Sequence, residues 1–151
     1  MKRFLLTTLF LLSVFSIFSQ QSKIDSLTIE FNKSKVDTTK AKILSEIGVI
    51  AYSMDRVLAS KINDSLISFS KTRSDKYLSH GSRMKGTLTL LNGDYDEAEN
   101  YYLKALEILK KISYQKGVAA LYSNLGTYIF LLKNRLFQFQ GDPKQIILKE
   151  F

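Results

Sequence analysis

The sequence predicts an all-α fold, and three observations support this prediction. Apolar residues recur at spacings of three and four along most of the chain, which is the period of one helical face. The 151 residues include only one proline and seven glycines, too few for a sandwich of short strands joined by tight turns. No segment shows a convincing strand pattern of alternating polar and apolar residues. The length is sufficient for one modest domain with its own core.

The beginning of the chain has the pattern of a secretory signal. Lys2 and Arg3 precede an uncharged apolar run, residues 4–18, and Ser19 follows as a small residue. We therefore expect residues 1–19 to be a signal peptide and the mature protein to be exported, either periplasmic or secreted, with no membrane span. An uncleaved anchor is the alternative, although the run is shorter than the about 20 residues that usually span a bilayer.

Composition excludes several kinds of site. The chain has no cysteine, so disulfides, zinc–thiolate sites, cysteine nucleophiles and a lipidated cysteine are all excluded. Without Lys2 and Arg3, 20 basic and 14 acidic residues leave a net charge of +6. These charges are spread among the predicted helices, which favours a solvated surface over a nucleic-acid interface.

Helices account for most of the predicted mature chain. Residues 20–37 are expected to form a leading helix, residues 22–33, and a linker, with Asp37 or Thr38 as the N-cap of the next helix. Asn92, Gly93 and Asp94 predict a turn, because Asn and Gly adopt turn conformations at low cost. The remaining helices are expected at residues 38–53, 55–72, 75–91, 95–113 and 115–132.

The chain repeats itself about every 39 residues. Gly48, Gly86 and Gly126 recur at intervals of 38 and 40 residues, each inside a predicted helix, where glycine costs about 1 kcal/mol relative to alanine. Three glycines in register indicate that a neighbouring helix approaches too closely for a side chain. Ala59 and Ala98 recur 39 residues apart, each in the helix that follows. A unit of two helices is therefore repeated.

One unit, "KGTLTLLNGDYDEAENYYLKALEIL", resembles a tetratricopeptide repeat, the helix-turn-helix unit of protein-interaction solenoids. The family pattern has a glycine in the first helix, a Gly-x-Tyr turn, and small and aromatic positions in the second helix. Residues 79–112 match it well, the unit before is weaker, and the unit after loses the pattern beyond Lys133. The matching residues here are Gly86, Gly93, Tyr95, Ala98, Tyr102 and Ala105.

The resemblance implies a short right-handed α-solenoid over residues 38–133, with about 2.5 repeats. In it, Ala98 and Ala105 let helices approach, while Tyr95 and Tyr102 fill wider gaps. A plain helical bundle is the rival architecture, but a bundle does not require glycine and alanine to recur in register. A chain that opens with an export signal, a short "IDSL" helix and the stretch "DTTKAKIL" is also similar to the sensor regions of some repeat-containing membrane signalling proteins.

The resemblance implies binding of a protein or peptide along the face made by the first helices of the repeats. That face would carry Ser45, Val49, Tyr52, Arg83, Thr87, Leu90, Ser123, Thr127 and Phe130. Among these we expect Tyr52, Arg83, Leu90 and Phe130 to contact the partner, since aromatic residues and arginine are favoured in binding hot spots. The family's clamp for a C-terminal carboxylate is not matched, because Glu46, Met84 and Asn124 stand at one of its positions.

No catalytic or cofactor-binding constellation is found. His80 is the only histidine, so it has no second histidine as a metal partner, and a partner contact near Arg83 is the better reading. "NGDYDEAE" lacks the ligand spacing of a calcium loop, and no phosphate loop is present. We therefore expect no enzyme activity, metal or cofactor. A basic helical nucleic-acid-binding protein is the alternative function, and it rests only on the mild positive charge.

The last segment, residues 134–151, does not continue the repeat. Gly141, Asp142 and Pro143 break the chain where a second helix should begin, and apolar residues follow. One interpretation is an irregular strand or short helix that covers the last repeat helix. The other, which we prefer, is that the chain is a truncated or frame-shifted form of a longer protein.

Overall fold

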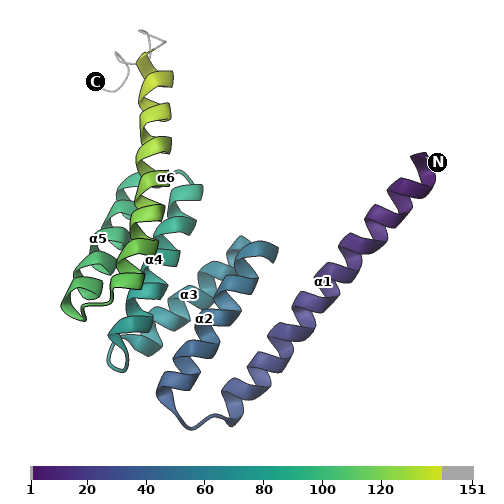
Figure 1. Cartoon of the computed structure of the whole chain (residues 1–151), viewed down its shortest axis with the longest axis horizontal. Coiled ribbons are helices and arrows are strands. Elements are labelled where there is room, and N and C mark those ends of the chain that lie inside the picture. Colours follow the sequence, from purple (N-terminus) through teal and green to yellow (C-terminus); the bar gives the residue numbers. More distant parts are fainter. Residues whose placement is uncertain (1, 141–151) are drawn as a thin grey trace. The chain divides into compact units, whose positions relative to one another are not determined.

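The structure is a computed structural model that describes the backbone of residues 2–140 and the side chains of residues 18–135. It contains six helices and no strand in this part of the chain, which confirms the all-α prediction (Figure 1). They are α1 (Lys2–Lys33), α2 (Asp37–Met54), α3 (Arg56–Ser70), α4 (Asp75–Leu91), α5 (Tyr95–Lys111) and α6 (Gln115–Gln140). The chain divides into two compact units, Met1–Gly81 and Ser82–Phe151.

Helix α1 differs from the expected division at Ser19. It runs without interruption from Lys2 to Lys33, so the segment expected as a signal peptide and the expected leading helix share one helix. The side chains of residues 1–17, which carry most of the signal pattern, lie outside the described set. Where side chains are described, no helix has the length and apolarity needed to cross a bilayer.

Two small clusters form the core of the first unit. Ile24 and Leu27 of α1 pack against Ile43 and Ile47 of α2, as the spacings of three and four predict. The second cluster joins α2 to α3 and contains Ala41, Leu44 and Leu66. The expected leading helix, which forms the last part of α1, is therefore packed against α2.

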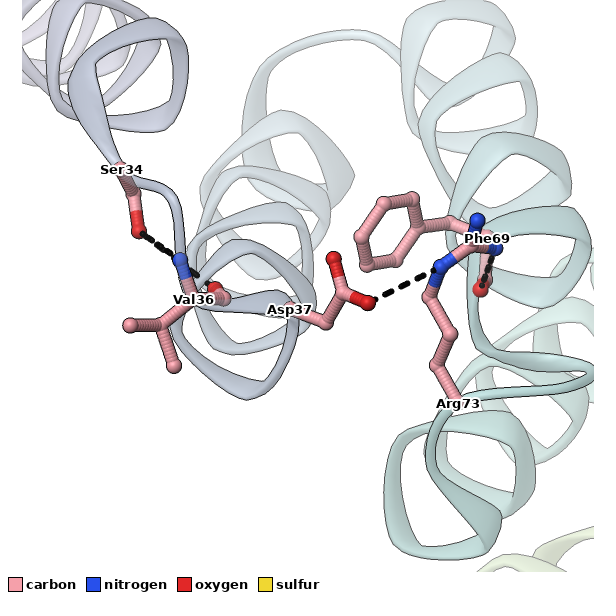
Figure 2. A network of polar contacts seen from close by, with 5 residues as sticks. All are labelled: Ser34, Val36, Asp37, Phe69 and Arg73. Carbon is pink, nitrogen blue, oxygen red and sulfur yellow. Dashed lines mark hydrogen bonds and ion pairs between the residues drawn. The ribbon is translucent and has the colours of Figure 1, made fainter.

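The start of α2 is held by a polar contact instead of a side-chain cap. Val36 takes the N-cap position without a side-chain hydrogen bond, so neither Asp37 nor Thr38 caps this helix. Asp37 instead forms an ion pair with Arg73, with 3.2 Å between Oδ2 and Nε (Figure 2). Arg73 also donates to the carbonyl of Phe69 and lies over its ring, 4.7 Å from the centroid. These contacts join the beginning of α2 to the end of α3.

Helix α5 organises the core of the second unit. Its buried residues recur at spacings of three and four and meet Leu90 of α4 and Leu121 and Tyr128 of α6. Gly93 has a φ of +88°, the left-handed conformation that favours glycine, so the predicted turn between α4 and α5 is confirmed. The buried residues of α5 are Ala98, Tyr102, Ala105 and Leu109.

Helix α6 is longer than expected. The prediction ended it near residue 132, because the repeat pattern is lost after Lys133, yet it continues to Gln140. Arg135 lies over the ring of Tyr95, 4.7 Å from the centroid, which ties this extension to the start of α5. The predicted break at residues 141–143 lies outside the described residues.

Candidate functional site

The three repeat glycines do not share one environment. A Cβ at Gly86 would lie 2.9 Å from two ring atoms of Tyr102 and 3.1 Å from the carbonyl oxygen of Ala98. A Cβ at Gly48 would meet Asn63 at 3.4 Å, an ordinary contact. At Gly126 a Cβ would meet nothing within 4 Å among the described residues. The expected close approach is therefore present at Gly86. Gly48 makes only an ordinary contact, and at Gly126 the prediction is wrong.

The other residues expected to pack the repeat behave as predicted. Ala98 and Ala105 are fully buried, and Tyr102 is 1% exposed. Tyr102 and Tyr95 both lie close to the ring of Tyr128, with centroid distances of 6.2 Å and 6.4 Å. Small residues where helices meet and aromatic rings in the wider gaps thus make up the α4–α5–α6 core.

Arg83 is the centre of a polar network that connects three helices. Its guanidinium Nη1 donates to Oδ1 of Asn124, in α6, at 3.0 Å. The Asn124 amide Nδ2 donates to the Thr87 hydroxyl at 2.7 Å. The Tyr102 hydroxyl also donates to Thr87, at 3.2 Å, and Thr87 donates to the backbone carbonyl of Arg83. The network fixes the Asn124 amide and therefore the direction of the guanidinium.

Among the described residues, the guanidinium of Arg83 has no negatively charged partner. It is half-buried, and burial lowers its pKa, while the neighbouring Tyr102 hydroxyl acts in the opposite direction. Among the described residues, no carboxylate lies within ion-pair distance of it. A guanidinium has five N–H donors and remains charged in proteins. Arg83 therefore presents a partly desolvated charge with donors left for an external acceptor.

The side of α6 next to Asn124 is open to solvent. Ser123, Thr127 and Phe130 follow at spacings of four and three residues, which places them on one helical face. All three are exposed, and Phe130 is 63% exposed. Phe130, one of the four expected contact residues, is thus exposed to solvent, while Arg83 is half-buried.

Leu90 is a wrong prediction. The resemblance placed it on the binding face, but it is 3% exposed and packs in the core with Tyr102 and Leu109. Because its whole side chain is taken up by the core, it cannot contact a partner. Tyr52 is half-buried in α2, in the first unit, and its expected role stays a prediction.

His80 pairs with Ser45, a residue that the sequence analysis placed on the expected binding face. Its Nδ1 lies 2.9 Å from the Oγ of Ser45, a contact that links α4 to α2 within the first unit. The serine hydroxyl and the imidazole nitrogen form a hydrogen bond whose direction depends on the tautomer of the ring. This contact accounts for the position of the only histidine in the chain.

Sequence reasoning missed two residues of importance. Asn124 was considered only as a departure from the carboxylate clamp, whereas it holds Arg83. The separation of 41 residues, close to the repeat period, could have paired them. Gly117 was not singled out, although a Cβ there would clash with Leu109 and Tyr114.

A pocket of about 370 Å³ lies at the start of α5, lined by Gly93, Asp94, Tyr95, Asp96, Glu97 and Arg135. Its three carboxylates lie at the positive end of the helix dipole, and this favourable interaction accounts for acidic residues at this position without a bound ligand. In the described part of the chain, no group of His, Asp and Glu side chains is arranged to hold a metal ion. The Arg83 network is therefore the better candidate site.

Comparison of the chain with family models, with curated proteins and with solved structures finds no match.

Proposed function

We propose that this chain is an exported protein-interaction module of the tetratricopeptide type, which binds a protein or peptide that offers a carboxylate to Arg83. The observation that carries the proposal is the half-buried Arg83 guanidinium, held by Asn124 and without a carboxylate partner among the described residues. Charged groups in such surroundings form strong hydrogen bonds to an acidic partner. Exposed Phe130, on the same helix as Asn124, would supply an apolar contact to the partner.

The repeat architecture of the proposal is supported by the pairing of helices. Gly48 of α2 faces Asn63 of α3, and Gly86 of α4 faces Tyr102 of α5, so in both pairs a glycine of the first helix stands opposite the second helix, at ordinary contact distance at Gly48 and much closer at Gly86. An α-solenoid built from such pairs presents its first helices on a common binding face. The proposed module would serve as the sensor-side region of a signalling protein or as a free binding protein.

Peptide selection tests the binding proposal. A random peptide library displayed on phage would be panned against the chain and against Arg83→Ala, with Arg56→Ala as the control that removes an exposed arginine elsewhere. We expect peptides with Asp, Glu or a free C-terminus to be enriched by the chain and by Arg56→Ala, and to be lost with Arg83→Ala. Tyr52→Ala tests whether α2 contributes.

Two results would contradict the binding proposal. Either no peptide is enriched, or the same peptides are retained by Arg83→Ala. Binding of nucleic acid that weakens steeply with salt would support the alternative function, because phosphate contacts release counterions.

Export can be tested separately. If residues 1–19 are a signal peptide, the chain expressed in a bacterium is cleaved, and mass spectrometry of the product finds an N-terminus at Gln20. Retention of residues 1–19 on a membrane-bound product would support the uncleaved anchor instead.

A further inference from the structure

Basic residues gather at one end of the first unit. The connection between α1 and α2, residues 34–36, lies at this end together with the connection between α3 and α4, residues 71–74. The ion pair between Asp37 and Arg73 joins the two regions, with 3.2 Å between Oδ2 and Nε (Figure 2). We call this end the basic tip and define it by its cations, which are Lys33, Lys35, Lys40, Lys71, Arg73 and Lys76.

The charge of the basic tip is unbalanced. Its six cations stand with two acidic residues, Asp37 and Asp75, which leaves a net charge of +4. Lys33, Lys35 and Lys71 are exposed, and no carboxylate of the described residues lies within ion-pair distance of them. The fold thus concentrates positive charge that the sequence divides between two separate stretches.

Helix dipoles account for only part of this cluster. Cations are favoured at the carboxyl ends of helices, where Lys33 closes α1 and Lys71 follows α3. Lys76, however, is the second residue of α4, at the end where the dipole disfavours a cation. Lys35 lies between α1 and α2 and belongs to neither helix. Helix stability therefore does not explain why the connection and the start of α4 are basic as well.

An exposed valine lies beside these cations. Val36 is 57% exposed, and Figure 2 shows its side chain directed away from the Asp37–Arg73 pair. The Ser34 hydroxyl holds the backbone here, because it accepts from the N–H of Val36 at 3.3 Å and donates to the carbonyl of Val36 at 3.4 Å. An exposed apolar side chain among cations suits an anionic membrane surface, where the apolar group enters the interface and the cations contact the headgroups.

The aromatic rings at the basic tip already have partners. Phe31 and Phe69 are half-buried and lie edge to face, with their centroids 6.3 Å apart. Lys40 lies over the ring of Phe31, 5.2 Å from the centroid, and Arg73 lies over the ring of Phe69. Proteins that bind single-stranded nucleic acid use rings that are free to stack on bases. These contacts therefore favour a lipid surface over nucleic acid as the partner.

We propose that the basic tip binds the surface of an anionic lipid bilayer, with Val36 in the interface and the cations against the headgroups. The contact is peripheral and crosses no part of the bilayer core. Each cation close to such a surface strengthens binding about fivefold, and the attraction fades beyond a Debye length of about 10 Å. The basic tip belongs to the first unit, so this binding does not depend on whether Arg83 of the second unit binds a peptide.

A fluorescent label at residue 36 tests the proposal, since the chain has no cysteine of its own. The full chain with Val36→Cys is labelled with an environment-sensitive dye and mixed with vesicles of equimolar phosphatidylglycerol and phosphatidylcholine. We expect a brighter, blue-shifted emission that added salt reverses, and no change with vesicles of phosphatidylcholine alone. The dye reports on the basic tip itself, whether or not residues 1–19 also enter the bilayer.

Val57 provides the control position for the label. It is 65% exposed and lies at the start of α3, at the opposite end of the helix pair α2 and α3. Its neighbours in the chain include Asp55 and Arg56, whose charges cancel. A dye on Val57→Cys should therefore show no response to either kind of vesicle.

Matched lysine variants assign the response to charge at the basic tip. Replacing Lys33, Lys35 and Lys71 by alanine, with the label at residue 36, should raise the lipid concentration for half of the response about a hundredfold. Arg73 is kept, because it pairs with Asp37. The control variant loses three exposed lysines outside the basic tip, namely Lys61, Lys104 and Lys110. Because both variants have the same net charge, a response that depends on the basic tip is changed only in the first.

Several outcomes would overturn the proposal. They are equal responses at residues 36 and 57, equal responses to the two kinds of vesicle, or equal shifts in the two lysine variants. A single-stranded oligonucleotide that binds through the same three lysines at lower concentration than the vesicles would assign the basic tip to nucleic acid instead.

Discussion

Gly86 lies so close to the ring of Tyr102 that a Cβ on the glycine would stand 2.9 Å from the ring carbons. Tyr102 cannot withdraw easily, because it is 1% exposed and its hydroxyl is bonded to Thr87. The same contact is next to the Arg83 network, since Thr87 also accepts from Asn124. The absence of a side chain at residue 86 thus sets both the packing of α4 on α5 and the geometry of the candidate site.

Gly86→Ala is expected to destabilise the protein. The added methyl group overpacks the contact at a cost of about 1–3 kcal/mol, which exceeds the gain of up to about 1 kcal/mol in helix propensity. Gly48→Ala is the matched control, because its Cβ meets only an ordinary contact at 3.4 Å from Asn63. Urea unfolding followed by circular dichroism should show a lower midpoint for Gly86→Ala alone. Equal shifts in both variants would contradict the packing role.

Ala98→Leu is the second packing prediction. Ala98 is fully buried, and its carbonyl oxygen lies close to the space beside Gly86. Three additional carbon atoms have no room, so we expect a loss of about 1–3 kcal/mol. Leu103→Ala is a suitable control for altered apolar content of α5, because Leu103 is exposed. A melting curve that Ala98→Leu leaves unchanged would remove the basis for the tight helix pair.

The helices were predicted well from the sequence because three local signals give the same boundaries: the spacing of apolar residues, the turn-forming residues between helices, and the scarcity of proline and glycine inside them. Helix α4 begins and ends where expected, and Gly93 adopts its predicted turn. The extension of α6 was missed, because repeat matching says nothing about a helix that continues after the pattern stops. Of the four residues expected to contact a partner, Leu90 is in the core, so this part of the predicted site is wrong, while the roles of Tyr52, Arg83 and Phe130 stay predictions. Helical spacing places Leu90 on a face of α4, while only the position of α5 decides whether that face is covered.

Asp55 provides a test of helix capping. Its carboxylate accepts hydrogen bonds from the backbone N–H groups of Val57 and Leu58 at 2.7 Å and 3.2 Å. Asp55→Ala should lower the free energy of unfolding by about 1 kcal/mol, since two N–H groups at the start of α3 lose their acceptor. Asp94→Ala is the matched control, because Asp94 occupies the N-cap of α5 without a side-chain cap bond. Chemical denaturation should separate the two, and an equal loss would indicate that helix-dipole charge dominates capping.

Tyr128 should make the stability depend on pH in the alkaline range. Burial, followed by the hydrogen bond from its hydroxyl to Glu99, raises the pKa of Tyr128 above the ordinary value. The folded chain therefore holds the phenol proton more tightly than the unfolded chain does. The resulting stabilisation is complete below the unfolded pKa of about 10 and is lost as the pH rises through the folded pKa.

Urea midpoints measured from pH 8.5 to about 11.5 check this prediction. The chain should lose stability more steeply above about pH 10 than Tyr128→Phe, which has no proton to release at this position. Tyr122→Phe serves as the control, because it removes an exposed tyrosine from the same helix. Tyr128→Phe will start from a lower midpoint, having lost the bond to Glu99, so the comparison concerns the slope with pH. Parallel slopes in all three proteins would show that the buried phenol does not govern the alkaline loss of stability.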